Sequence, residues 1–151
     1  MKRTVSAVLM PALAVVALGF AAGRTPASPP ETVPPGLVSI EGGEYQPLYA
    51  KAADKRKVGS YLLGLKQVTN AEFLEFVREN PQWQKSKVSP AEADINYLRH
   101  WAGDLDLGPQ GDAMRDAPVT HVSWFAARAY CAARGLRLPT QDEWEFAARA
   151  D

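Results

Sequence analysis

The last third of the chain contains two short segments whose starts are fixed by hydroxyl caps, and these starts constrain the fold most. Ser123 precedes the segment WFAARAYCAAR, and Thr140 precedes QDEWEFAAR. A side-chain oxygen at this position accepts a hydrogen bond from an unpaired amide of the first helical turn. Thr140 and Glu143 also have the spacing of a capping box, in which the glutamate returns a second hydrogen bond. The sequence therefore predicts one helix after Ser123 and another over 141–150.

Both predicted helices have an apolar face with helical spacing. The faces consist of Ala127, Tyr130 and Cys131 in the first helix and Trp144, Ala147 and Ala148 in the second. Gly135 follows the first helix, where a left-handed residue commonly ends a helix.

A third helix is predicted near the middle of the chain by a second capping box. Thr69 and Glu72 have the required spacing, and apolar residues follow at positions 73, 76 and 77. The dipeptide Asn80-Pro81 ends this pattern, because proline cannot continue a helix.

Short extended segments complete the predicted fold. GLVSIEGGEYQPLY predicts a strand, a turn at Gly42-Gly43 and a second short strand, and KVGSYLLGLKQVT predicts a third. A strand-like alternation is present in PVTHVSW. A short helix is predicted for AEADINYLRHW, and the rest of 82–116 predicts a long irregular connection. The fold class is therefore α+β.

The first 23 residues predict an export signal. Two positive residues precede a stretch without charge that ends in small residues, as in secretory signal peptides. About 20 apolar residues could also span a bilayer as an uncleaved anchor, but Pro11 and a weakly hydrophobic tail favour cleavage near 21–23. The proline-rich segment 24–35 predicts an extended linker. We expect an exported, periplasmic or extracellular protein whose folded domain begins at residue 36.

Charge and composition exclude several classes of partner. Seventeen lysines and arginines balance 17 aspartates and glutamates, so neither nucleic acid nor a membrane is expected as a partner after signal cleavage. The longest basic run, Lys55-Arg56-Lys57, is interpreted as a solvated loop.

Residue chemistry alone indicates no reaction. His100 and His121 lie outside any metal-binding spacing, and Cys131 is the only cysteine. His121 is interpreted as structural, whereas a base role stays open for His100. The consecutive carboxylates Asp142 and Glu143 point apart and suit first-turn helix charges better than acid–base chemistry.

Aromatic residues in the long connection are the candidate site. They could line a groove that binds a peptide or sugar, or they could attach the loop to the core, and the sequence favours neither. The candidate groove residues are Trp83, Tyr97, His100 and Trp101.

The segment PVTHVSWFAARAYCAARGLRLPTQDEWEFAARA closely resembles the signature of the formylglycine-generating enzyme family, the sulfatase-modifying factor domain. That signature has the form PV-x-x-VSW-x-x-A-x-x-YC-x-x-x-G-x-RLPT-x-x-EWE-x-AAR. The matching residues are Pro118, Val119, Val122, Ser123, Trp124, Ala127, Tyr130, Cys131, Gly135, Arg137, Leu138, Pro139, Thr140, Glu143, Trp144, Glu145, Ala147 and Ala148.

Earlier segments extend the resemblance over residues 36–151. LVSIEGGEY and YLLGLKQVTNAEFLEFV are similar to the opening strands and first helix of the family. Glu41 stands where proline is common, and Gln67 stands where an acidic residue is usual. NPQW and ADINYLRHW are similar to a bacterial subgroup with a long insertion before the PV motif.

The resemblance implies a loop-rich variant of the C-type-lectin fold. The family's enzymes oxidise a cysteine of a client sulfatase to formylglycine, with molecular oxygen and copper held by two cysteines, and structural calcium is also implied. Relatives include iron-dependent sulfoxide synthases, pyoverdine-maturation proteins and accessory proteins of nitrite reductase clusters. Other members act as structural or binding parts. A client protein or peptide is the partner that this resemblance implies.

The resemblance stops at the EWE helix, which is the midpoint of the family's domain. The copper cysteines, most calcium ligands and much of the peptide groove belong to the following half, so no catalytic or metal-binding residue is assigned to this chain. Cys131 matches a cysteine that some members pair with one in that half. Three hypotheses follow: an N-terminal portion of an enzyme, a non-catalytic binding or accessory module, or a degenerate fragment. In each case we expect the chain alone to be inactive.

Overall fold

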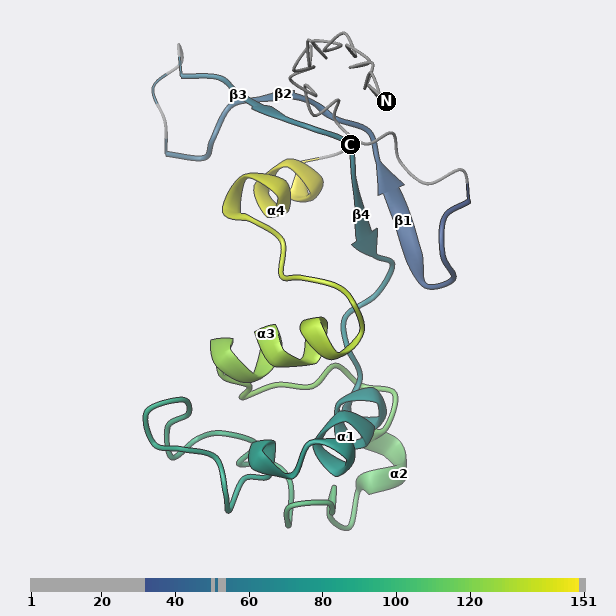
Figure 1. Cartoon of the computed structure of the whole chain (residues 1–151), viewed down its shortest axis with the longest axis vertical. Coiled ribbons are helices and arrows are strands. Elements are labelled where there is room, and N and C mark those ends of the chain that lie inside the picture. Colours follow the sequence, from purple (N-terminus) through teal and green to yellow (C-terminus); the bar gives the residue numbers. More distant parts are fainter. Residues whose placement is uncertain (1–31, 50, 52–53, 150–151) are drawn as a thin grey trace, which may run out of the picture.

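The computed structural model describes residues 32–49, 51 and 54–149 and shows an elongated molecule with two ends of different composition (Figure 1). The strands and α4 form one end, and α1, α2 and α3 form the other. This mixture agrees with the α+β class. The elements are β1 (Leu37–Ile40), β2 (Gly43–Tyr45), β3 (Arg56–Val58), β4 (Tyr61–Gly64), α1 (Asn70–Glu79), the 3-10 helix η1 (Pro81–Trp83), α2 (Gly111–Met114), α3 (Trp124–Ala133) and α4 (Gln141–Ala148).

The four strands form a bent antiparallel ribbon. β1 pairs with β4 and β2 pairs with β3, so the predicted turn at Gly42-Gly43 is a bend between two strands that pair with different partners. The single strand predicted for 57–69 is likewise divided into β3 and β4. A Cβ on Gly42 would lie 2.6 Å from the carbonyl oxygen of Val58 and 2.7 Å from the amide nitrogen of Ser60. Only glycine therefore fits where the ribbon bends.

All three predicted helix starts are confirmed. Thr69 and Thr140 each form a complete capping box, and the Ser123 hydroxyl accepts from the amide of Ala126. The first helix ends at Asn80 as predicted, and Gly135 has a φ of +69° after α3. These starts depend on groups three residues apart, which explains why the sequence predicted them correctly.

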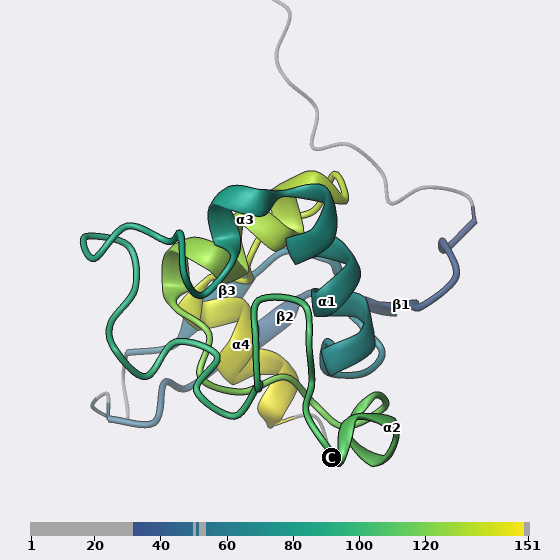
Figure 2. The ribbon, with the colours of Figure 1, turned by 90° about the horizontal axis from the view of Figure 1, so that it is seen from below.

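The main hydrophobic core lies at the end of the molecule formed by α1, α3 and the long connection (Figure 2). Its aromatic centre is Phe73, whose ring lies 5.3 Å from Phe76 and 5.6 Å from Tyr130, measured between centroids. The buried cluster consists of Phe73, Leu74, Phe76, Val77, Trp83, Tyr97, Leu98, Trp101, Leu107, Ala126 and Tyr130.

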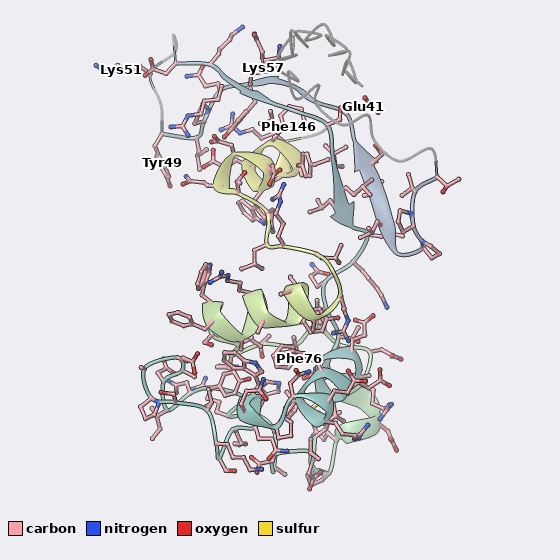
Figure 3. The ribbon with its side chains drawn as sticks, viewed as in Figure 1. Glu41, Tyr49, Lys51, Lys57, Phe76 and Phe146 are labelled. Carbon is pink, nitrogen blue, oxygen red and sulfur yellow. The ribbon has the colours of Figure 1, made fainter. Side chains whose placement is uncertain are left out.

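α4 packs against the ribbon through a different face from the predicted one. Phe146 lies edge-on to Tyr45, with ring centroids 5.9 Å apart, and points toward the strands in Figure 3. Asp142 accepts hydrogen bonds of 2.7 Å from both the Tyr45 hydroxyl and Arg56. Trp144, predicted to be part of the apolar face, is 62% exposed. The helical pattern did not predict that Phe146 would face the ribbon, because its partner Tyr45 lies about 100 residues earlier in the chain.

Two predicted elements are wrong. AEADINYLRHW forms turns rather than a helix: Leu98 has a φ of +48°, which an α-helix cannot contain. PVTHVSW is not a strand, because Pro118 makes only an isolated bridge with Thr69 and His121 has a φ of +54°. In both segments tertiary hydrogen bonds, such as the 2.8 Å bond from the Leu98 amide to the His121 carbonyl, replace the local pattern. The four-residue helix α2 was not predicted.

The predicted signal peptide, 1–23, and most of the predicted linker, 24–35, lie outside the described residues, so both stay predictions. Across the described ranges, no helix has the length and apolar character needed to cross a membrane.

Candidate functional site

Three of the four candidate groove residues are buried. Trp83, Tyr97 and Trp101 are 7%, 5% and 2% exposed. The Tyr97 hydroxyl donates to the carbonyl of Trp83 at 3.0 Å, and the Trp101 indole donates to the Asn70 side chain at 2.9 Å. Such burial agrees with the interpretation in which these aromatic residues attach the long connection to the core. A groove lined by all four residues stays a prediction.

Two pockets border this aromatic group. The larger has a volume of about 410 Å³ and lies between the connection at 90–97 and the start of α3; Tyr97 is the only candidate groove residue that lines it. The smaller, about 320 Å³, is lined by His100 and Trp101 together with residues next to α2. The described structure therefore divides the candidate residues between two sites, and Trp83 lines neither.

The aromatic wall of the larger pocket comes from the first turn of α3. Trp124 and Phe125 lie edge-on with ring centroids 5.3 Å apart, and they are 59% and 44% exposed. Their position follows from the helix itself: Ala126 and Tyr130 face the core, so the two residues after Ser123 must face outward. Two consecutive aromatic residues directly after a helix cap are the signal that sequence reasoning overlooked.

Acidic and polar groups form the opposite wall. Glu92, Asp94 and Asn96 line it, and Asp94 accepts a 2.8 Å hydrogen bond from the amide of Asn96, which holds this carboxylate in place. The guanidinium carbon of Arg128 lies 5.5 Å from the Trp124 ring centroid, so the chain's own cation already covers this ring. Glu92 and Asp94 are the acidic residues of the pocket, so a ligand with a positive group would place it beside them and an apolar group against Phe125.

A cluster of polar side chains consists of Asn70, His100, Trp101 and His121, and Asn70 binds the two residues at its centre, His100 and Trp101. The Nε2 atom of His100 lies 3.1 Å from the side-chain oxygen of Asn70, which also accepts from Trp101. An indole can only donate, so this oxygen is an acceptor and Nε2 of His100 carries the proton. The His121 ring lies 5.5 Å from that of His100, between centroids. The other ring nitrogen of His100 is buried and has no hydrogen-bond partner among the described residues.

We predict that this cluster makes stability depend on pH. Burial, and then the nearby His121, Lys85 and Arg99, lower the pKa of His100 below its ordinary value of 6.5. The folded state therefore binds this proton less readily than the unfolded state, so stability is full above pH 6.5 and falls as pH decreases through that value. Urea unfolding at pH 7.5 and 5.0 should show this loss.

His100→Gln is the matched variant, because its amide can still donate to Asn70 but does not titrate. Its loss of stability between the two pH values should be smaller than that of the natural chain. An equal loss in both proteins would assign the pH dependence to other groups.

The cysteine and metal chemistry implied by the resemblance has little support in these side chains. Cys131 is half-buried, and burial raises the pKa of its thiol, which disfavours the thiolate that binds metals. A copper site made of two cysteines does not fit a chain that contains one. Within the described ranges, no three histidine, cysteine, aspartate or glutamate side chains are grouped closely enough to hold a metal ion.

Comparison with known proteins agrees with the signature. The family described as the sulfatase-modifying factor enzyme 1-like domain matches residues 23–151. The inactive C-alpha-formylglycine-generating enzyme 2 of Mus musculus is 34% identical over 148 residues, which cover 76% of this chain and 47% of that protein. The hercynine oxygenase of Mycolicibacterium smegmatis is 35% identical over 103 residues, which cover 62% of this chain and 24% of that protein.

The formylglycine-generating enzyme of Bos taurus is also similar. It is 29% identical over 159 residues, which cover 87% of this chain and 42% of that protein. The chain thus spans less than half the length of each of these three relatives. A match over all of the described residues establishes the relationship, and the chain belongs to the sulfatase-modifying factor enzyme 1-like domain family.

Proposed function

We propose that this chain is the N-terminal half of an exported formylglycine-generating-type domain and that it binds a client peptide without completing a catalytic centre. The observation that carries the proposal is the larger pocket, with its aromatic wall and its acidic wall, in a chain that matches the first part of this family. In the proposed complete domain, the architecture is the C-type-lectin-like variant.

Exposed apolar side chains support the half-domain interpretation. Trp144 on α4, Leu136 in the α3–α4 connection and Leu65 after β4 are 62%, 45% and 71% exposed. Exposed apolar surface of this kind marks a site of contact with other protein. α4 contacts the ribbon on one side only, so the face with Trp144 is available for the remainder of the domain.

The shape and charge of the pocket support binding of a client peptide. An extended peptide with an apolar side chain beside a basic one could place the first against Trp124 and Phe125 and the second near Asp94. The Ser123 oxygen accepts the capping hydrogen bond from the amide of Ala126, and among the described residues this hydroxyl has no hydrogen bond to a base. The site therefore has groups for binding and orientation but no activated nucleophile.

A second candidate function is a non-catalytic binding or accessory module, for example in a nitrite reductase system. The observation that favours it is the similarity to a relative named as inactive. In this case the same pocket would bind a partner that is never oxidised.

Both candidate functions predict that this chain binds a peptide in the larger pocket. Calorimetry should detect binding of a sulfatase-type cysteine peptide with a basic residue, and Trp124→Ala should weaken that binding about tenfold or more, as expected for a central aromatic contact. Trp144→Ala is the matched control, since it removes an equally exposed tryptophan from another helix. Equal effects of the two substitutions, or no binding, would overturn the proposed site.

Activity is tested separately. The chain, incubated with the same peptide, copper and oxygen, should produce no aldehyde in mass spectrometry. Aldehyde formation would show that the chain completes a catalytic centre and would contradict the half-domain proposal.

A further inference from the structure

One backbone hydrogen bond joins the two walls of the larger pocket. The Leu98 amide donates to the carbonyl of His121 at 2.8 Å. One wall, from 90–97, ends directly before Leu98, and the other wall, from 121–125, begins at His121. Leu98 is 0% exposed, so the core holds one side of this bond in place. We call the hydrogen-bonded pair Leu98 and His121 the clasp, and its bond fixes the distance between the walls.

Both residues of the clasp have a left-handed backbone. The angle φ is +48° at Leu98 and +54° at His121, a region that is unfavourable for side chains of this size. Such a conformation persists only where surrounding contacts impose it. The clasp therefore depends on the side chains packed beside it, and loss of one of their contacts favours release of the strained backbone.

The rings of His100 and His121 pack beside the clasp, with centroids 5.5 Å apart. His100 is held from the core side, because its Nε2–H donates to the side chain of Asn70. Its Nδ1 atom is buried and has no hydrogen-bond partner among the described residues. A proton on Nδ1 would therefore produce a buried donor without an acceptor, next to a second histidine.

The charges near His100 are positive. Burial, followed by His121, Lys85 and Arg99, lowers the pKa of His100. In the described part of the chain, neither histidine forms an ion pair with a carboxylate. Two protonated rings at this separation would repel each other without a counter-charge between them.

His121 has an alternative position available when it is charged. Its side chain is exposed, and the uncharged Thr120 hydroxyl lies 3.0 Å from its Nδ1 atom. Glu92 and Asp94 line the opposite wall of the same pocket. A protonated His121 is therefore repelled by His100 and attracted to the carboxylates that a positively charged ligand would use.

We infer that the clasp and its two histidines form an acid-sensitive switch of the larger pocket. While both rings are uncharged, the clasp holds the walls at a fixed distance and leaves Glu92 and Asp94 to the ligand. When both rings carry protons, His121 leaves His100, the clasp opens and the ligand is released. Histidine is the side chain that ordinarily changes its charge between pH 5 and 8. The identity of the ligand, a peptide with a basic residue, rests on the proposed function.

Hydrogen exchange of the Leu98 amide tests the clasp on the whole chain without a ligand. Its protection, corrected for the intrinsic effect of pH, should fall about tenfold between pH 7.5 and 5.0, because the open clasp binds protons more readily. The Trp144 amide in α4, which donates to the Thr140 carbonyl at 3.0 Å, is the control and should change little. Equal losses at both amides would indicate general unfolding and would overturn the inference.

Two variants each remove one charge of the pair. His100→Gln keeps a donor for Asn70, and His121→Asn places a residue that tolerates the left-handed backbone. In each variant the protection of the Leu98 amide should change less than about threefold between the two pH values. Arg78→Gln, at an exposed position of α1, is the control and should retain the loss of the natural chain. A full loss in either histidine variant would overturn the inference.

Calorimetry with the peptide of the proposed function then tests the consequence for binding. The natural chain should bind it about tenfold more weakly at pH 5.0 than at pH 7.5, whereas His100→Gln should bind it nearly equally at both. Equal binding by the natural chain at both pH values would overturn the switch. Absence of binding at pH 7.5, together with the expected exchange of the Leu98 amide, would contradict the proposed function and support the clasp.

Discussion

Phe73→Ala should unfold much of this protein at 25 °C without denaturant. Phe73 is 1% exposed, and its ring contacts Phe76, Tyr130 and Trp101, the last at a centroid distance of 6.3 Å. Removing a buried aromatic ring costs about 3–5 kcal/mol, since it combines lost transfer free energy with a cavity. Natural domains have only about 5–15 kcal/mol of stability in total. The loss therefore approaches the whole margin of a domain at the lower end of that range.

The measurement is urea unfolding followed by tryptophan fluorescence. Trp83 and Trp101 lie in the same buried cluster as Phe73, so their emission reports on its packing. Phe125→Ala is the matched control, because it removes the same ring from a side chain that is 44% exposed. The control should change the free energy of unfolding by about 0.5 kcal/mol. Similar losses for both variants would show that the core is not centred on Phe73.

Asn70→Ala should be the second most destabilising change. Asn70 is 1% exposed and joins three segments: its oxygen accepts from Trp101 and His100, and its nitrogen donates to the carbonyl of Met114 at 3.1 Å. A buried group left without its partner costs about 1–3 kcal/mol. Because several groups lose a partner together, we expect a loss of roughly 3 kcal/mol or more.

The backbone contribution of Asn70 separates this effect from loss of the helix. The backbone N–H of Asn70 donates to the carbonyl of Ala117 at 3.0 Å. Alanine has the same backbone group, so we expect α1 to keep this connection in the variant. Urea unfolding should show the loss, and near-ultraviolet circular dichroism should show a changed environment for Trp101. Asn96→Ala, at an exposed position, is the control and should leave both signals nearly unchanged. A small effect of Asn70→Ala would mean that ordered water replaces the amide.

The helix starts were predictable because every group involved lies close in sequence. Thr69 with Glu72 and Thr140 with Glu143 form their reciprocal bonds across three residues. In contrast, the predicted helix around Tyr97 and the predicted strand around His121 were wrong because Leu98 bonds to His121 across 23 residues. Local propensity is weaker than such tertiary bonds in short segments.

The sequence favoured neither a groove nor attachment to the core for the aromatic residues of the long connection. In the structure Trp83 and Trp101 are buried, and the exposed aromatic side chains beside the larger pocket are Trp124 and Phe125. Burial of an aromatic ring depends on which elements pack around it. Local sequence patterns do not show which residues far apart in the chain will pack around a given ring.

By itself, the sequence determined the family, the caps of three helices and the α+β class, because signatures and capping boxes depend on residue types at short, fixed spacings. Only the tertiary structure decided which rings face the core, that Asn70 joins His100 and Trp101 to α1, and that Phe146 rather than Trp144 packs on the ribbon. These arrangements depend on contacts between residues far apart in the chain, where the lowest free energy is a property of the whole fold.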